Sequence, residues 1–249
     1  MVTQQATAPA AGRWKLTWQD EFSQPTSLRK WAFQTGGTGW SLKQLQWYGA
    51  SNASVDGQGD LVITASKSGQ GQRCWYGACR YSSVRMNTLS TFTQAYGRFE
   101  ARIQVPIDAG LWPAFWLEGA NISKVGWPRC GEVDIVESNG QHPDVVQGYA
   151  HALHNNHNGY FTLPRPLSAG FHVYGVDWNP QGITWFVDGY RYAHMNAYPG
   201  WPFSHPFYII LDLAVGGAWP GPPGASTHFP ARMLVDWVRV YRAAPPKAG

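Results

Sequence analysis

The amino-acid sequence predicts an all-β domain built from two packed antiparallel sheets, and three observations support this fold class. Apolar segments of strand length recur between Gly, Pro and Asn signals. No long stretch has the period of an amphipathic helix, and no internal repeat stands out. Many short strands separated by turns favour a sandwich over a parallel α/β sheet. The expected strands cover residues 14–18, 61–65, 98–105, 171–178, 183–187, 207–215 and 234–241.

Two of these segments carry clear local signals. In residues 97–105, apolar side chains at odd positions alternate with polar side chains at even positions, which indicates a strand with one face in the core and one in water. Asp188 and Gly189 form the Asp-Gly pair typical of a two-residue hairpin turn. Segment 183–187 should therefore pair with a short strand that follows it.

A further strand is expected at residues 131–138, where an apolar stretch carries three carboxylates, Glu132, Asp134 and Glu137. Side chains alternate faces along a strand, so Glu132 and Asp134 share a face and Glu137 would point away from them. A β-bulge at Ile135 and Val136 would return Glu137 to the face of the other two acids, and bulges are frequent beside active sites. Val133 and one residue of the Ile135-Val136 pair would then face the core.

The spacing of these acids suits the chemistry of a retaining glycosidase. Strand rise places Glu132 and Glu137 roughly 5 to 9 Å apart, depending on how the bulge bends the chain. The two carboxyl groups of a retaining glycosidase stand about 5 to 5.5 Å apart. The alternative is a solvated face on an edge strand. The apolar residues at 112–116 and within the acidic segment instead indicate a buried strand, where unpaired carboxylates are costly unless they perform chemistry.

Composition narrows the classes of function. Charged residues make up only 14% of the chain and aromatics 15%, with 14 Trp, which favours recognition by ring stacking. The net charge is +4, but Lys and Arg are scattered without a run, so no nucleic-acid partner is expected. No segment approaches the roughly 18 apolar residues of a membrane span, so no membrane partner is expected either.

The 249 residues suit one catalytic domain, which we place at 13–243 because the composition does not change along the chain. Residues 1–12 are small and polar, lack the features of a signal peptide, and are expected to be a flexible N-terminal segment or linker. Residues 244–249 are expected to be a flexible C-terminal tail. We expect a secreted monomer whose signal peptide is not part of this sequence.

Three cysteines require an explanation. Cys74 and Cys79 could close a short loop in an oxidising compartment. Cys130 is then left without a partner, and a small buried hydrophobic residue is the expected role because no positive neighbour is evident. The spacing does not favour metal binding by the three.

Beyond these patterns, the chain resembles glycoside hydrolase family 16, and within it the bacterial endo-β-1,3-glucanases, or laminarinases. The resemblance covers nearly the whole chain, and the acidic motif with its extra residue is its most specific part. The matching segments are 18–22 (WQDEF), 56–65 (DGQGDLVITA), 96–102 (YGRFEAR), 112–116 (WPAFW), 127–132 (WPRCGE), 171–172 (FH), 177–178 (DW), 185–189 (WFVDG), 213–217 (LAVGG) and 235–241 (VDWVRVY).

The resemblance implies a β-jelly-roll sandwich with a concave sugar cleft. Glu132 matches the nucleophile, Asp134 the assisting aspartate, and Glu137 the general acid/base. The residues support the same roles, since retention needs one ionised carboxylate to attack and one protonated carboxyl to reach the leaving oxygen. Asp134, lying between them, should separate their pKa values through like charge, and we expect the pKa of Glu137 to be the raised one.

Sugars present C–H faces, so a sugar cleft should combine flat rings with hydrogen-bonding groups. Trp112 and Trp116 share a strand face, and the resemblance places them at the non-reducing side; the alternative is that one of them, more readily Trp116, belongs to the core. Trp127 and Trp219 lie in Gly/Pro-rich loops where exposure is expected.

The resemblance also implies sugar contacts for three polar residues. His151 matches a histidine near the nucleophile, although a structural histidine explains it nearly as well. Asn52 and Arg85 match positions that touch sugar hydroxyls, although polar loop residues usually face water.

Two departures from the laminarinase pattern concern specificity. Gln44 stands where many relatives have a glutamate, which would retune a sugar contact. Residues 152–159 replace a Gly/Ser-rich loop, and with His151 they place three histidines close together, the others being His154 and His157. A metal site is one explanation of these histidines, and contacts with solvent or sugar are the favoured one.

No cofactor is expected for catalysis. The resemblance implies a structural Ca²⁺ on the convex face, with Asp236 as side-chain ligand and Glu21 and Gly59 as backbone ligands. Hard oxygen donors suit Ca²⁺, and such a remote ion would brace the termini.

Three functions remain open from the sequence. The favoured one is a retaining endo-β-1,3-glucanase that cleaves laminarin-like β-glucan by double displacement. A non-catalytic β-glucan-binding protein is disfavoured by the intact pair of glutamates. A hydrolase or transglycosylase of the same family that acts on mixed-linkage glucan or galactan is kept open by Gln44 and the loop 152–159.

Overall fold

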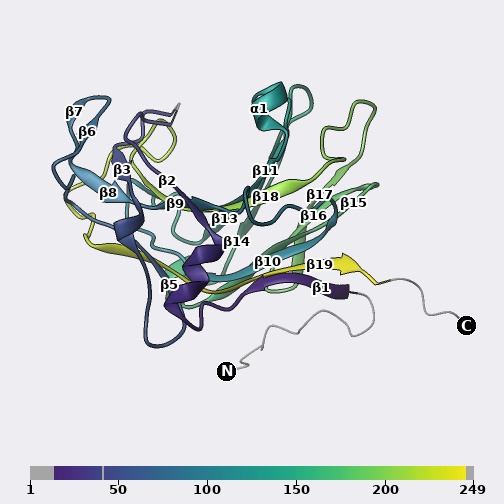
Figure 1. Ribbon diagram of the computed structural model, residues 1–249, viewed down its shortest axis with the longest axis horizontal. Coiled ribbons are helices and arrows are strands. Elements are labelled where there is room, and N and C mark those ends of the chain that lie inside the picture. Colours follow the sequence, from purple (N-terminus) through teal and green to yellow (C-terminus); the bar gives the residue numbers. More distant parts are fainter. Residues whose placement is uncertain (1–13, 41, 245–249) are drawn as a thin grey trace, which may run out of the picture.

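The computed structural model describes residues 14–40 and 42–244, and its two main antiparallel sheets confirm the predicted all-β sandwich. Figure 1 shows them as two layers, with loops that include α1 (Ile122–Val125) rising beyond one of them. The expected N-terminal segment 1–12 and nearly all of the tail 244–249 lie outside the described residues. Among the residues that the structure describes, no helix is long and apolar enough to cross a membrane.

We call the sheet that contains the acidic strand the cleft sheet. Its order is β14-β13-β12-β11-β18-β9-β2. Its strands are β2 (Ala32–Gln34), β9 (Arg85–Asn87), β11 (Leu111–Gly119), β12 (Glu132–Glu137), β13 (Val145–His151), β14 (His157–Thr162) and β18 (Phe207–Val215).

We call the other layer the back sheet. Its order is β17-β16-β15-β10-β19-β5-β4, with β1 also paired to β19. Its strands are β1 (Trp14–Asp20), β4 (Ala53–Val55), β5 (Leu61–Ala65), β10 (Gly97–Gln104), β15 (His172–Asn179), β16 (Gly182–Val187), β17 (Tyr190–Asn196) and β19 (Ala231–Ala243).

Shorter elements complete the fold. β3 and β8 form a parallel pair, and β6 and β7 a small hairpin. Their bounds are β3 (Gln46–Tyr48), β6 (Arg73–Cys74), β7 (Gly77–Ala78) and β8 (Tyr81–Ser83), and the 3₁₀ turns are η1 (Pro25–Lys30), η2 (Ala50–Asn52) and η3 (Leu167–Ala169).

The hydrophobic core lies between the two sheets. Every predicted strand is present, and the Asp-Gly hairpin is confirmed: Val187 pairs with Tyr190, and Asp188 and Gly189 both have positive φ, 49° and 80°. The outer face of β10 differs from the expectation of a strand half in water. Glu100 is only 4% exposed, because the long side chains of Arg98, Arg239 and Tyr241 lie around its carboxylate.

The structure contains a disulfide between Cys74 and Cys79, which closes the β6–β7 loop. Cys130 is buried with a free thiol, and burial raises its pKa to about 12. A thiol with so high a pKa is a poor nucleophile at neutral pH, in agreement with a packing role.

Candidate active site

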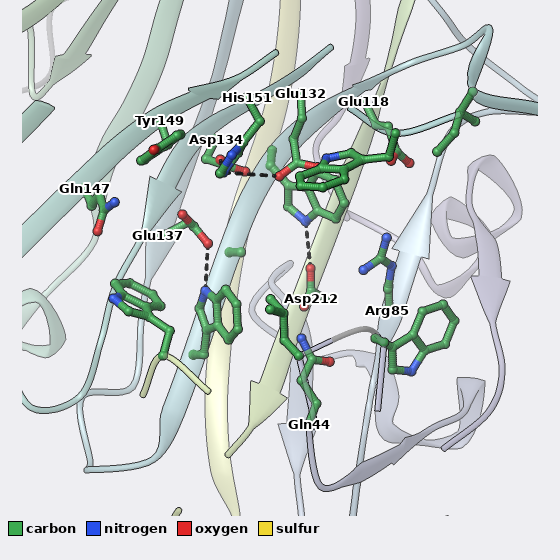
Figure 2. Close-up of a pocket in the computed structure, with 18 residues that line it drawn as sticks. Gln44, Arg85, Glu118, Glu132, Asp134, Glu137, Gln147, Tyr149, His151 and Asp212 are labelled. Atoms are coloured by element: carbon green, nitrogen blue, oxygen red, sulfur yellow. Dashed lines mark hydrogen bonds and ion pairs between the residues drawn. The ribbon is translucent and has the colours of Figure 1, made fainter. Parts of the chain in front are cut away.

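The predicted bulge is present in β12. On the β11 side, Phe115 pairs with Val136 and Trp116 with Asp134, so Ile135 is the extra residue between two pairs. The insertion resets the alternation of faces, and Glu132, Asp134 and Glu137 all line one cavity of about 740 Å³ (Figure 2). The bulge therefore gathers on one face three acids whose spacing does not fit a regular strand.

The bulge is packed and bonded from the core side. Val133, Ile135 and Val136 all belong to the hydrophobic core, so two consecutive residues are buried at the bulge where we expected one. Trp185, which lies in β16 of the back sheet, donates a hydrogen bond from Nε1 to the Asp134 carbonyl oxygen at 2.8 Å. This bond reaches across the core and supports the bulged backbone from behind.

Indole N–H groups hold the two glutamates. Trp127 Nε1 donates to Glu132 Oε2 at 2.9 Å, and Trp112 Nε1 donates to Glu137 Oε1 at 2.8 Å. Each bond fixes one carboxylate oxygen, so the second oxygen of each glutamate is available for another partner. The two donors come from different elements, since Trp127 lies in the loop before β12 and Trp112 in the neighbouring strand β11.

His151 faces Glu132 and Asp134. Its Nε2 lies 3.7 Å from Glu132 Oε1 and 3.4 Å from Asp134 Oδ2, and its ring stacks on Tyr149 with centroids 4.0 Å apart. Asp134 is almost fully buried, and within the described part of the chain its Oδ2 has no hydrogen bond. This buried oxygen makes Asp134 an unfavourable place for a full negative charge.

All three acids have raised pKa values, and burial is the largest cause in each case. Repulsion from Asp134 further raises the pKa of Glu132 and of Glu137, whereas the nearby His151 lowers both. We expected the pKa of Glu137 alone to be raised, so the structure extends the effect to the whole group. The reason is that a buried strand face removes water from all three carboxyl groups together.

The lining of the cavity contains two further acids, Asp212 of β18 and Glu118 of β11. Asp212 accepts hydrogen bonds from Trp116 Nε1 at 2.7 Å and from the Tyr48 hydroxyl at 2.9 Å. Glu118 accepts one from the Tyr208 hydroxyl and is paired in register with Glu132. Our sequence reasoning did not identify either residue, although an acid within the apolar run 207–215 was a signal of the same kind as the acidic strand.

Comparison with known proteins places this site in a family. The family model of the glycosyl hydrolases family 16 matches residues 27–239. The chain belongs to this family.

Individual relatives of this family 16 chain are similar to it in sequence, and a solved structure is similar to it in fold. The beta-glucanase of Rhodothermus marinus is 38% identical over 93% of this chain and 86% of its own length. A glucan endo-1,3-beta-glucosidase of Cryptopygus antarcticus is 36% identical over 84% of this chain and 83% of its own length. The structure of an endo-beta-1,3-glucanase from Pyrococcus furiosus aligns with a TM-score of 0.87 at 39% identity, covering 94% of this chain and 96% of that one.

Most of the predicted binding residues line the family 16 cavity. These are Gln44, Arg85, Trp112, Trp116, Trp127, His151 and Trp219. Trp127 is 57% and Trp219 38% exposed, as expected for loop residues, and the Trp219 ring meets Trp112 edge-on at 5.1 Å.

Trp116 and Arg85 form a packed pair in the cavity wall. The Arg85 guanidinium lies 4.6 Å from the centroid of the Trp116 ring, and the ring also packs on Tyr208 and Ile210. Trp116 thus has both of the roles that the sequence left open, because it is only 8% exposed within a small apolar cluster and also lines the cavity.

Asn52 is placed elsewhere. It is buried in η2, its Nδ2 donates to the Ser83 carbonyl oxygen at 3.2 Å, and its Oδ1 accepts from the Ser82 hydroxyl. The structure does not bring it among the residues that line the cavity. Its amide is used to join η2 to β8.

The histidines after β13 do not form a metal site with His151. Within residues 14–40 and 42–244, the group of His, Cys, Asp and Glu side chains close enough to hold an ion is Glu132, Asp134 and His151, with ligand atoms within 4.8 Å of one another. His154 and His157 are not part of it, and the His157 ring lies beside Trp185, with centroids 5.8 Å apart.

Proposed function

We propose that this chain hydrolyses internal β-1,3 linkages of laminarin-like glucan by double displacement, with Glu132 as nucleophile and Glu137 as general acid/base. The observation that carries the proposal is the bulge in β12, which turns both glutamates into one aromatic-walled cavity. Membership of family 16 and the glucanase relatives support the same activity.

The contacts of the two glutamates support the division of roles. Glu132 has the Trp127 indole N–H and the His151 ring as partners, and both stabilise the ionised form that attacks the anomeric carbon. Both glutamates have raised pKa values, but of the two only Glu132 has a histidine ring at ion-pair distance among the described residues, so Glu137 is the carboxyl better suited to carry the proton that the leaving oxygen needs. After the aglycone leaves, the Glu137 carboxylate takes a proton from the water that opens the glycosyl-enzyme ester.

Asp134 is expected to act through its neighbours. Because burial and the charges of Asp212 and Glu118 raise its pKa, Asp134 retains a proton more readily than an exposed aspartate. Whenever Asp134 is ionised, its charge also raises the pKa of Glu132 and of Glu137. Asp134 therefore helps to decide where the protons reside within the group.

The aromatic residues supply the binding surface for the sugar chain. Trp112, Trp127 and Trp219 line the cavity around the acids, and their rings match the C–H faces of glucosyl units. Arg85 and Gln44, on the far side of Asp212, offer hydrogen-bonding groups for hydroxyls.

A substrate panel tests the activity. We expect rapid release of reducing ends from laminarin, slower release from barley mixed-linkage glucan, and none from agarose or β-1,3-galactan. Proton NMR of the first products should show the β-anomer, because double displacement retains configuration. A preference for galactan or agarose would favour the alternative assignment within the family, α-anomeric first products would exclude the mechanism, and binding without turnover would identify a glucan-binding protein.

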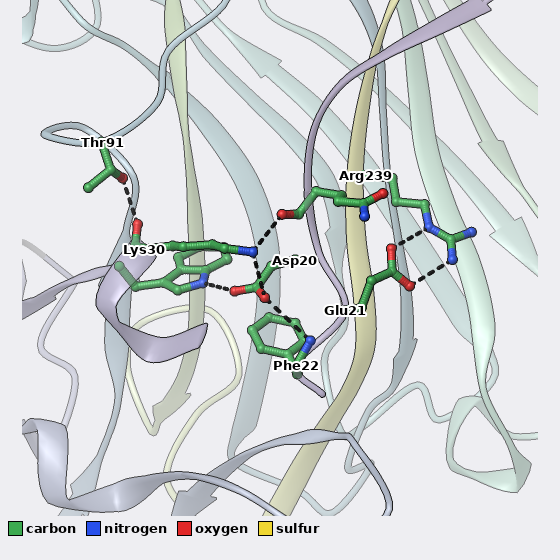
Figure 3. Close-up of polar contacts among 8 residues, drawn as sticks. Asp20, Glu21, Phe22, Lys30, Thr91 and Arg239 are labelled. Atoms are coloured by element: carbon green, nitrogen blue, oxygen red, sulfur yellow. Dashed lines mark hydrogen bonds and ion pairs between the residues drawn. The ribbon is translucent and has the colours of Figure 1, made fainter. Parts of the chain in front are cut away.

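We also propose a structural Ca²⁺ at Asp236 and the backbone oxygens of Glu21 and Gly59. The topology supports it: β19, which contains Asp236, pairs with β1 just before Glu21 and with β5 just after Gly59. The Glu21 carboxylate is occupied by Arg239, at 2.8 Å for both of its oxygens (Figure 3), so only its backbone is available as a ligand. Arg102 Nη1 donates a hydrogen bond to Asp236 Oδ2 at 2.5 Å, so Oδ1 is the carboxylate oxygen of Asp236 left for the ion.

Calcium removal tests this site. We expect chelation to lower the Tm by about 2–4 °C, the shift that about 1 kcal/mol produces in a domain of this size. The measurement is thermal unfolding in excess EGTA and in excess CaCl₂, on the parent chain and on Asp236→Asn. Equal Tm values of the parent chain in the two buffers would contradict the proposal.

The secreted location and the monomeric state stay predictions, as do the domain bounds. The disulfide between Cys74 and Cys79 supports secretion, because such bonds persist mainly in oxidising compartments.

A further inference from the structure

A line of directly paired residues crosses the cleft sheet at the level of Glu137. In one direction Glu137 pairs with Gln147 of β13, which pairs with Tyr160 of the edge strand β14. In the other direction Glu137 pairs with Ala114 of β11, which pairs with Asp212. Directly opposite residues of antiparallel strands project from the same face of a sheet. The pairing therefore places Tyr160 on the face of the catalytic carboxylates.

The contacts of Phe161 and Gly159, the two chain neighbours of Tyr160, agree with this orientation of Tyr160. Phe161 faces the back sheet, where its ring lies 4.7 Å from that of Tyr190 in β17. A Cβ atom on Gly159 would stand 2.3 Å from Cβ of Ala193, which also lies in β17. Because neighbours on a strand point to opposite faces, Tyr160 and Asn158 project away from the core.

Figure 2 shows Gln147, Glu137 and Asp212 spread across the cleft floor in this order. Gln147 and Tyr149 are the β13 residues at the end of the cavity toward β14. Their partners across the ladder are Tyr160 and Asn158, so the floor continues onto the edge strand beyond the cavity.

Tyr160 has the surroundings of a sugar platform. Its side chain is 57% exposed, and its hydroxyl oxygen accepts a hydrogen bond from Asn158 Nδ2 at 3.3 Å. A single exposed tyrosine is common on protein surfaces, so exposure alone carries nothing. Here Tyr160 belongs to the paired row of Glu137, with the amide of Gln147 across the ladder and the amide of Asn158 two residues away on the same strand face. A flat ring beside amides matches the C–H face and the hydroxyls of a pyranose.

We propose that Tyr160, with Asn158 and Gln147, forms an outer glucosyl-binding subsite on the side of the carboxylates away from Trp116. The proposal rests on the proposed glucanase function and deepens it. Two strand spacings, about 10 Å, separate Tyr160 from Glu137 along the row. A glucosyl unit spans roughly one strand spacing, so the ring meets a sugar about two units from the cleaved bond. Only chains long enough to extend past Gln147 reach it.

The test compares substrates of different length. We expect Tyr160→Ala to lower the ratio of kcat/KM on laminariheptaose to kcat/KM on the shortest β-1,3-gluco-oligosaccharide cleaved by the parent chain. The expected drop is about three- to tenfold, the range of one aromatic contact. Tyr160→Phe should keep most of the ratio, because it retains the ring.

Tyr190→Ala is the matched control. Tyr190 is 60% exposed and packs against β14 through Phe161, but it belongs to the back sheet. Its substitution should leave the ratio unchanged, which separates lost stacking from loosening of the edge strand. Calorimetric titration of laminariheptaose into Glu132→Gln and into Glu132→Gln/Tyr160→Ala should show weaker binding by a similar factor in the double variant.

The outcomes separate the two proposals. An unchanged ratio in Tyr160→Ala, in a chain that cleaves both oligosaccharides, would overturn the subsite and leave the glucanase function intact. An equal fall of the ratio in Tyr190→Ala would also overturn it. A parent chain that cleaves no β-1,3-gluco-oligosaccharide would overturn both the function and the subsite.

Discussion

Replacing Glu132 with Gln is expected to lower kcat on laminarin by about 10⁴-fold or more, because the amide cannot attack the anomeric carbon. The side chain keeps its size, and its amide oxygen can still accept the hydrogen bond from Trp127 Nε1. One of three mutually repelling buried acids is also removed, so the fold should be retained or slightly stabilised. Reducing-sugar release and the Tm measure the two effects.

Azide distinguishes a lost nucleophile from other causes of inactivity. The substrate for this test is a β-1,3-gluco-oligosaccharide with an activated aryl leaving group in β-linkage. When Glu132→Gly is given this substrate and azide, we expect partial recovery of turnover and an α-glycosyl azide as product. Azide then attacks directly in place of the carboxylate, which gives a single inversion. Appreciable laminarin turnover by Glu132→Gln, or a β-azide from Glu132→Gly, would show that Glu132 is not the nucleophile.

Glu137→Gln is expected to lower kcat on laminarin by about 10³-fold or more, because the sugar leaving group departs without a proton. The effect should depend on the leaving group. An aryl glycoside with an acidic phenol needs no proton, so formation of the glycosyl-enzyme should be much less impaired. With Glu137→Ala, azide should accelerate breakdown of that intermediate and give a β-glycosyl azide. Equal impairment on laminarin and on the activated aryl glycoside would contradict the acid/base role.

The dependence of kcat/KM on pH in Asp134→Asn tests whether Asp134 is coupled to the two glutamates. With the proposed roles, we expect activity between the pKa of Glu132, which must be ionised to attack, and that of Glu137, which must be protonated to donate. Repulsion from Asp134 raises both pKa values. In Asp134→Asn this repulsion is absent, so both limbs of kcat/KM should move to lower pH, with a smaller loss of rate than in either glutamate variant. An unmoved profile would mean that Asp134 is not coupled to the pair.

The raised pKa values of the three acids also make the free energy of unfolding depend on pH. A carboxyl whose pKa is raised on folding binds more protons in the folded state than in the unfolded state. The free energy of unfolding therefore falls as the pH rises from the ordinary carboxyl pKa through the raised one. Asp134→Asn should reduce this loss, because it removes one of the acids and its repulsion of the others.

The local pattern of the chain was sufficient to predict much of the site. A bulge at Ile135 and Val136 followed from the spacing of three acids in an apolar segment, because alternation along a strand involves only neighbouring residues, and the strand pairing then identified Ile135 as the extra residue. The Asp-Gly hairpin followed from backbone preferences of two residues for the same reason. Trp127 and Trp219 were predicted to be exposed from the turn residues around them, and they are.

Other features depended on contacts between distant segments. Strands that are remote in sequence are needed for the burial of Glu100, for the hydrogen bond from Trp116 to Asp212 and for the raised pKa of Glu132. Asn52 shows the converse: a polar residue matched to sugar binding uses its amide to bond Ser83 and Ser82. No property of residues 50–54 alone predicts those partners.

By itself the sequence determined the all-β class, the bulged acidic strand and its three carboxylates, because strand periodicity and turn preferences act over a few residues. The tertiary structure decided which further side chains face those carboxylates and how far the row of paired residues extends, from Asp212 to Tyr160. That depends on the register between strands that are far apart in the chain, and register is set only when the sheets pack on a common core.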